Sequence, residues 1–127
     1  MKIALDTNTY TDAARADPKA MEVLQSADEI YLPFVVIAEL RSGFSLGVKG
    51  KKNEAKLIEF LNTPRVKALF PDEQSTHHYA RVYSHLKKQG TPIPTHDIWI
   101  AALALQHDLI LFSRDIHFSH IPQIGKI

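Results

Sequence analysis

Apolar residues along the chain fall into two alternating patterns, short continuous runs and longer stretches with helical spacing or length. Short apolar runs bounded by turn residues are typical of buried strands, whereas apolar residues at every third or fourth position are typical of amphipathic helices. The runs of strand length are 3–5, 29–32, 66–70 and 109–112. The helical stretches are 9–15, 18–27, 34–44, 53–62, 72–88 and 95–105. Strands that alternate with helices predict a central parallel sheet covered on both faces, which is a three-layer α/β/α fold.

The periodicity is ambiguous in part of this pattern. The run Val35-Val36-Ile37 taken alone is compatible with a strand, but its continuation through Glu39-Leu40-Arg41 favours a helix. The segment 45–52 carries two glycines and three lysines, so we expect a flexible connection there. The chain contains no repeat, low-complexity tract or linker, and its 127 residues predict a single domain, 1–127.

Composition narrows the class of protein. With 45% hydrophobic and 23% charged residues, the chain matches an ordinary globular domain. It has no cysteine, which excludes disulfides, thiol nucleophiles and thiolate metal sites. The carboxylate of Asp6 follows the first apolar run too early for a signal peptide, and no apolar run is long enough to span a membrane. We therefore expect a soluble, cytoplasmic protein with no membrane partner.

The distribution of charge is more informative than its sum. A formal net charge of +1 does not by itself indicate a nucleic-acid partner. However, Lys49, Lys51 and Lys52 lie together in the expected flexible segment, and Arg114 precedes a carboxylate near the end of the chain. Basic residues around an acidic site suit a polyanion whose phosphates must approach a metal ion. These side chains are candidate contacts to a nucleic-acid backbone; the alternatives are solvated lysines and, for Arg114, a surface ion pair.

Several carboxylates lie where the predicted fold brings chain segments together. Asp6 and Asp115 each follow an apolar strand, and Asp97 falls in the first turn of a predicted helix, where the helix dipole favours an anion. Glu39 interrupts the apolar face of the helix predicted over 34–44. Ligands of open parallel sheets bind at the carboxyl ends of the strands. We therefore expect these carboxylates to converge at that edge.

Each carboxylate also has an ordinary structural explanation. Asp6 and Asp115 fit helix caps or turns. Asp97 fits the acid of a helix start, and Glu39 can pair with the nearby Arg41. If the acids do converge, two like charges ~4 Å apart cost on the order of 4 kcal/mol at an effective dielectric of 20, which raises pKa values or attracts a cation. Oxygen ligands without cysteine favour Mg²⁺ or Mn²⁺, and such an ion can activate water to hydrolyse a phosphodiester.

Motifs at normal spacing along the whole chain carry a family resemblance. The segments are Leu5-Asp6-Thr7-Asn8, 36–43 with Glu39-Leu40-x-x-Gly43, Asp97-Ile98-Trp99-Ile100-Ala101-Ala102, and Leu111-Phe112-Ser113-Arg114-Asp115 with His117-Phe118. In this order they resemble the PIN-domain ribonucleases of the VapC type, which are toxins of bacterial toxin–antitoxin pairs. Ser113 stands where that family usually has Thr, which keeps the hydroxyl. His96 stands where Asn is frequent, and we expect it to face solvent.

The resemblance implies a PIN-like domain and a set of roles. It implies a metal-dependent endoribonuclease that cuts RNA, with tRNA or rRNA as the substrate. Asp6, Glu39, Asp97 and Asp115 would be the catalytic acids that bind Mg²⁺ or Mn²⁺. Asn8 and Ser113 would support them. The implied partners are a small cognate antitoxin protein and a second copy of the chain in a homodimer.

Two other families of phosphate-handling proteins also have an Asp after the first strand, and individual residues of this sequence argue against both. Phosphatases of the haloacid-dehalogenase type need Asp-x-Asp-x-Thr, and Asn8 replaces their second Asp. A receiver module with Asp72 as phosphoacceptor would need paired acids after the first strand and a lysine near the last, and neither is evident. A PIN nuclease that processes RNA without being a toxin, or a PIN module that only binds, stays possible.

The histidine pairs His77-His78 and His117-x-x-His120 lack a third ligand, so we expect surface positions. Trp99 is expected in the core or at a subunit contact.

Overall fold

The centre of the fold is a fully parallel sheet. The computed structural model describes residues 1–127. Its strands are β1 (Lys2–Leu5), β2 (Glu29–Pro33), β3 (Val66–Leu69) and β4 (Ile110–Phe112). They are arranged in the order β3-β2-β1-β4, and each neighbouring pair is parallel. The predicted strands and the predicted parallel sheet are confirmed.

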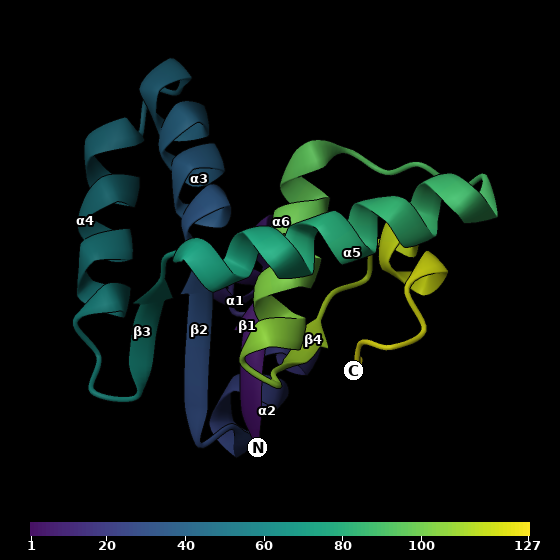
Figure 1. The fold of residues 1–127 in the computed structure, drawn as a ribbon. Coiled ribbons are helices and arrows are strands. Elements are labelled where there is room, and N and C mark those ends of the chain that lie inside the picture. Colours follow the sequence, from purple (N-terminus) through teal and green to yellow (C-terminus); the bar gives the residue numbers. More distant parts are fainter.

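Helices connect the strands and cover the sheet. They are α1 (Thr7–Ala14), α2 (Pro18–Ser26), α3 (Phe34–Leu46), α4 (Gly50–Leu61), α5 (Glu73–Gln89) and α6 (Thr95–Gln106), with a short 3₁₀ helix, η1 (Ile116–His120), after β4. In Figure 1, α5 and α6 lie in front of the sheet and α1 and α2 lie behind it, which is the predicted three-layer arrangement. Helix α3 continues from the carboxyl end of β2 and packs beside α4. The ambiguous Val-Val-Ile run is therefore helical.

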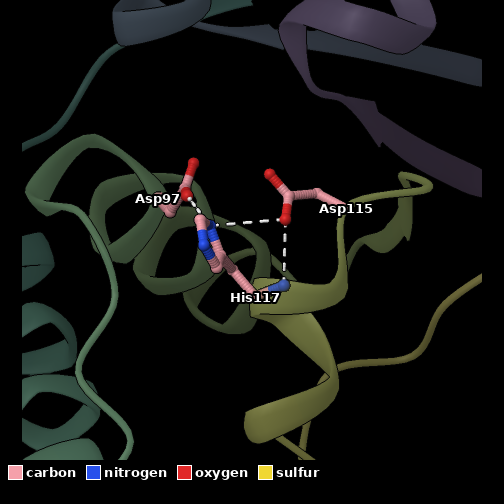
Figure 2. Close-up of side chains that lie close together, drawn as sticks. All are labelled: Asp97, Asp115 and His117. Carbon is pink, nitrogen blue, oxygen red and sulfur yellow. Dashed lines mark hydrogen bonds and ion pairs between the residues drawn. The ribbon is translucent and has the colours of Figure 1, made fainter.

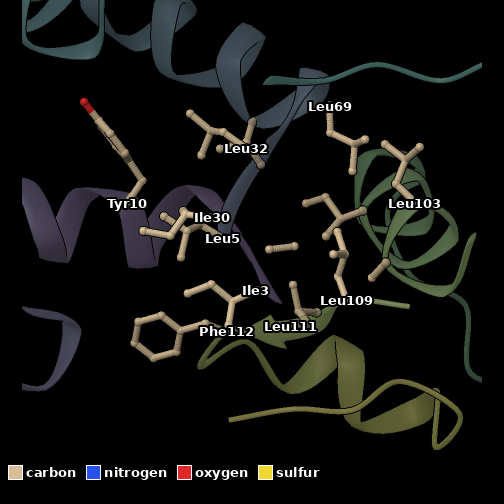
Figure 3. Packing of buried hydrophobic residues seen from close by; sticks show 14 of the residues in the cluster. Ile3, Leu5, Tyr10, Ile30, Leu32, Leu69, Leu103, Leu109, Leu111 and Phe112 are labelled. Atoms are coloured by element: carbon tan, nitrogen blue, oxygen red, sulfur yellow. The ribbon is translucent and has the colours of Figure 1, made fainter. Parts of the chain in front are cut away.

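Burial on both faces explains why the strands are continuously apolar. Successive residues of a strand point to opposite faces of the sheet. Nevertheless Ile3, Ala4 and Leu5 are each 0% exposed, so neither face of β1 reaches solvent. Figure 3 shows Ile3 and Leu5 packed among apolar side chains of the neighbouring strands, including Leu32 and Leu111. Such burial is typical of a parallel sheet between helical layers.

Helix ends follow the capping signals of the sequence. Asp17 caps α2 and Pro18 occupies its first position, as predicted. Helix α5 begins with a capping box, in which the backbone N–H of Ser75 donates to Asp72 Oδ1 at 3.1 Å. Gly90 ends α5 with φ of 78°, a left-handed conformation that glycine adopts without a steric penalty.

The segment 45–52 is more ordered than predicted. Helix α3 continues through Leu46 and α4 already begins at Gly50, so only residues 47–49 lie outside helices. The expected flexible connection is therefore a tight helix–helix turn. A Cβ atom at position 50 would collide with the backbone carbonyl of Phe44, so this close approach depends on glycine. The two glycines in the sequence predict where the turn lies, but they do not predict that it is tight.

Residues after β4 extend the sheet rather than forming a loose tail. The backbone N–H of Leu111 donates to the carbonyl of Gly125 at 2.7 Å, and that of Ile127 donates to the carbonyl of Leu111 at 3.1 Å. Phe118 and Ile121, which lie between β4 and Gly125, are fully buried. These contacts fix the segment that carries Asp115. No helix of the protein has the length and apolar character that crossing a membrane requires.

Trp99 fixes the start of α6 against two other helices. Its ring centroid lies 5.8 Å from that of Phe34 on α3 and 4.6 Å from that of Tyr79 on α5. Trp99 is therefore a half-buried packing residue between helices, at the margin of the core, and the alternative of a subunit contact stays a prediction. Because Asp97 and Glu39 lie on α6 and α3, this packing sets the distance between the two acids.

The strand order reverses at β1. The chain adds β2 and β3 on one side of β1 and then returns to place β4 on its other side. In open parallel sheets, the crevice outside the carboxyl ends of the strands at such a reversal is where ligands bind. Residues after β1 and β4, namely Asp6 and 113–115, flank this crevice.

Candidate active site

Asp6 is both a helix cap and a member of the site. It is 5% exposed, and its Oδ1 accepts hydrogen bonds from the backbone N–H of Thr9 at 3.0 Å and from the Thr9 hydroxyl at 2.8 Å. Its Oδ2 accepts a hydrogen bond from the hydroxyl of Ser113, which follows β4. The cap explanation and the site explanation are therefore compatible, because each uses a different carboxylate oxygen.

Thr9 was not identified from the sequence. Its side chain is almost fully buried, and its Oγ1 lies 2.8 Å from Asp6 Oδ1 and 3.0 Å from the carbonyl oxygen of Phe112. The hydroxyl therefore holds Asp6 against the end of β4. The spacing Asp-x-x-Thr, which is a capping-box signature with the acid at the cap, was the available signal.

Ser113 connects two of the predicted acids. Its hydroxyl donates to Asp6 and accepts from the backbone N–H of Asp115 at 3.0 Å. Asn8, the other predicted support, is exposed in the first turn of α1, and its side chain makes no hydrogen bond to the acids. The supporting contact that was expected from Asn8 comes instead from Thr9.

Asp97 is a buried carboxylate at the start of α6. It is 5% exposed, and burial raises the pKa of its carboxyl above the ordinary value. A hydrogen bond from His117 and the charge of His96 oppose this rise in pKa, while the charge of Asp115 adds to it. A buried acid beside a second acid is stabilised by a cation, so the raised pKa is consistent with a metal site.

His117 lies between two of the acids (Figure 2). Its Nδ1 is 2.8 Å from Asp97 Oδ2 and 3.3 Å from Asp115 Oδ1, and its backbone N–H donates to Asp115 Oδ1 at 2.9 Å. The prediction that no further ligand lies near this histidine is therefore wrong, although its side chain remains 39% exposed. Asp97, its closest partner, lies 20 residues away in the sequence, so local spacing could not reveal it.

Glu39 joins the group through His96. The Nε2 atom of His96 lies 3.5 Å from Glu39 Oε2 and 3.5 Å from Asp97 Oδ1. Both Glu39 and His96 are about half exposed, so His96 faces solvent as predicted and also bridges two acids. Arg41 pairs with Glu54 at 2.9 Å, which contradicts the alternative that Arg41 neutralises Glu39.

A continuous chain of contacts therefore links the predicted acids. Its members, in order of contact, are Asp6, Ser113, Asp115, His117, Asp97, His96 and Glu39. The most compact part is Asp97, Asp115 and His117, whose potential ligand atoms lie within 4.8 Å of one another. This acidic cluster can hold a metal ion, because it offers carboxylate oxygens and one imidazole nitrogen at short range.

The predicted basic contacts differ in their surroundings. Lys49 and Lys52 line a hollow of about 290 Å³ between α1, α3 and α4, together with Arg15 and Lys56, and no acid lines it. Lys51 lines an adjoining shallow surface with Lys49 and Lys52. In contrast, the guanidinium of Arg114 makes two hydrogen bonds, of 3.0 and 3.2 Å, to the carboxylate of Asp12. Arg114 thus forms the surface ion pair that was its alternative explanation.

Comparison with known proteins identifies relatives of the whole fold. Residues 3–124 match the family described as PIN domain. Ribonuclease VapC1 of Haemophilus influenzae (strain R2866) is 34% identical over 116 residues, which cover 88% of this chain and 85% of that protein. Toxin FitB of Neisseria gonorrhoeae (strain ATCC 700825 / FA 1090) is 34% identical over 121 residues, covering 89% of this chain and 87% of that protein. The solved VapBC2 from Rickettsia felis, bound to a DNA fragment from their promoter, superposes with a TM-score of 0.86 at 27% identity, over 100% of this chain and 98% of that chain.

Proposed function

This chain belongs to the PIN-domain family, and we propose that it is a divalent-metal-dependent endoribonuclease acting as the toxin of a toxin–antitoxin pair. The observation that carries the proposal is the chain of contacts that gathers Asp6, Glu39, Asp97 and Asp115 at the strand reversal. A binding module would need no buried acid of raised pKa at this position. The relative named Ribonuclease VapC1 supports the reaction class, and the relative named Toxin FitB supports the role as a toxin.

The acids Asp6, Glu39, Asp97 and Asp115 would hold Mg²⁺ or Mn²⁺. When bound, such an ion supplies an activated water and neutralises charge on the scissile phosphate. The protein contributes the orientation of the ligands. Thr9 and Ser113 each bond one oxygen of Asp6, which prevents the carboxylate from rotating. Asp97 is kept from water by burial, so its charge acts on the site with little screening.

The RNA backbone would approach over the basic surface beside α3 and α4. Lys49, Lys51 and Lys52 are exposed there, and the neighbouring hollow adds Arg15 and Lys56. Their charges would attract phosphates and position them without reading the base sequence. We propose a loop of tRNA or rRNA as the substrate, cut in the cytoplasm to leave 5′-phosphate and 3′-hydroxyl ends.

The proposed protein partner is a small antitoxin. The Rickettsia felis relative was solved as VapBC2 on promoter DNA, and this chain resembles it over its full length. By this likeness, an antitoxin would bind the present chain and keep it from RNA until the antitoxin is removed. We also propose that the chain forms a homodimer, which sedimentation of the purified protein would test directly.

Cleavage of RNA by the purified chain tests the proposal. Total tRNA and rRNA are incubated with Mg²⁺, with Mn²⁺, or with EDTA, and the ends of the products are mapped. We expect cleavage that EDTA abolishes and that Asp6→Asn and Asp97→Asn each reduce by at least about 100-fold. Glu22→Gln, at an exposed acid on α2, is the matched control and should cleave like the unchanged chain. Cleavage that survives EDTA and both aspartate substitutions would overturn the metal-dependent mechanism. If the chain neither binds Mn²⁺ nor cleaves, it is a silent PIN module.

A further inference from the structure

His117 brings a different donor atom to a site whose predicted ligands are all carboxylates. Its Nδ1 lies 2.8 Å from Asp97 Oδ2 and 3.3 Å from Asp115 Oδ1 (Figure 2). Neighbouring ligands on an octahedral ion with bonds of about 2.1 Å are separated by about 3.0 Å. The nitrogen therefore has the separations from both oxygens that ligands of one shared ion have.

The backbone around His117 fixes the position of the ring. Asp115 caps η1, and its Oδ1 accepts the backbone N–H of His117 at 2.9 Å. The next residue, Phe118, is fully buried in the core and anchors the segment. A carboxylate oxygen has further lone pairs, so Asp115 Oδ1 can accept this hydrogen bond and still bind a metal ion. His117 is thus held at the cluster by its own helix and not by a flexible loop.

The type of donor atom affects which ion the site prefers. Mg²⁺ takes oxygen ligands and water, whereas imidazole nitrogen suits transition-metal ions. For sites with nitrogen and oxygen ligands, affinity rises from Mn²⁺ to Co²⁺ in the first-row order. A cluster in which one of three close donors is a nitrogen should discriminate against Mg²⁺.

We propose that His117 is a direct metal ligand through Nδ1 and gives this site a preference for Mn²⁺ and Co²⁺ over Mg²⁺. The proposal rests on the proposed function in one respect, namely that the acidic cluster binds a divalent ion. His96 differs from His117, because its Nε2 lies 3.5 Å from both of its acidic neighbours and its side chain is more exposed. His96 is therefore a suitable control.

Metal binding by calorimetry is the first test. Mg²⁺, Mn²⁺ and Co²⁺ are titrated into the intact chain and into the variants His117→Ala, His117→Asp and His120→Ala. We expect His117→Ala to lower the affinity for Co²⁺ by about 10- to 100-fold and the affinity for Mg²⁺ by less than about 3-fold. His117→Asp restores an all-oxygen site and should shift the preference toward Mg²⁺. Equal losses for Mg²⁺ and Co²⁺ in His117→Ala would overturn the proposal.

Electron-spin-echo spectroscopy of bound Mn²⁺ is the second test, and it does not depend on activity. A directly bound imidazole nitrogen modulates the echo of the Mn²⁺ spin. We expect this modulation in the intact chain, in His96→Ala and in His120→Ala, and its loss in His117→Ala. Modulation that persists in His117→Ala, or that disappears in His96→Ala instead, would overturn the proposal. Thermal unfolding of each variant establishes that it is folded.

The two proposals fail in different ways. If the intact chain binds Mn²⁺ and cleaves RNA but its Mn²⁺ shows no nitrogen modulation, the role of His117 is wrong and the nuclease proposal stands. If the intact chain binds no divalent ion, both the metal-dependent mechanism and the role of His117 are wrong.

Discussion

The hydroxyl of Ser113 donates a hydrogen bond to Asp6, although 107 residues separate the two in the sequence. This contact joins the residues that follow β1 and β4, and the same hydroxyl accepts the backbone N–H of Asp115. One small side chain thus orients two of the acids of the site.

Removal of that hydroxyl should weaken metal binding. In Ser113→Ala, Asp6 and Asp115 each lose a partner that orients them, so we expect Mn²⁺ affinity and kcat/KM for RNA to fall by about 10- to 100-fold. Ser113→Thr keeps the hydroxyl and should retain most of both. Ser119→Ala, which removes an exposed hydroxyl bonded only to a backbone carbonyl of η1, is the control. Unchanged Mn²⁺ affinity in Ser113→Ala would contradict the orienting role.

Thr9 should contribute to stability as well as to the site. Thr9→Val keeps the shape of the side chain but leaves the buried carbonyl of Phe112 and the backbone N–H of Asp6 without their hydroxyl partner. We expect the free energy of unfolding in urea to fall by about 1–3 kcal/mol. Thr11→Val on the same helix removes a hydroxyl that bonds only the carbonyl of Thr7, and should cost less than about 1 kcal/mol. An equal cost for the two variants would contradict this prediction.

The raised pKa of Asp97 predicts a pH dependence of the metal-free protein. Its folded pKa lies above the unfolded value of about 3.9, so the folded state binds more protons between the two values. The resulting stability is fully present below the unfolded pKa and is lost as pH rises through the folded pKa. In EDTA, we therefore expect the stability of the unchanged chain relative to Asp97→Asn to fall as pH rises above about 4 and then to level off.

Urea unfolding from pH 3.5 to 7.5 in EDTA would measure this difference. Added Mn²⁺ at neutral pH should stabilise the unchanged chain more than Asp97→Asn, because only the former offers the full set of ligands. A stability difference that does not change with pH would show that Asp97 has an ordinary pKa.

The basic surface beside α3 and α4 should bind RNA mainly through charge. Replacement of Lys49, Lys51 and Lys52 together by alanine should weaken RNA binding in EDTA. It should also lower the slope of log affinity against log salt by about 0.7 for each phosphate that the lysines no longer neutralise. Replacement of the exposed Lys19, Lys87 and Lys88 is the matched control. The measurement is fluorescence anisotropy of a labelled RNA at several salt concentrations, and an equal effect of both triple variants would place the RNA elsewhere.

The strands, and the places of the acids at the ends of strands and helices, could be predicted from the sequence because both depend on the local pattern of apolar and polar residues. Asp6 could be placed at a strand end because the apolar run before it is buried on both faces of the sheet. His117 could not be placed, because its role depends on Asp97, which arrives from a different helix. The two glycines between α3 and α4 predict a loose turn because glycine is conformationally free, whereas in the structure Gly50 allows a close approach to Phe44.

The strand order has a consequence for the newly made chain. Strand β1 is made long before its neighbour β4, and pairing such distant segments requires closure of a long loop. A nascent chain that has folded only as far as β3 holds Asp6 and Glu39 but contains neither Asp97 nor Asp115. By the proposed metal mechanism, nuclease activity would therefore arise only once Asp97 and Asp115 have been made and β4 has paired with β1.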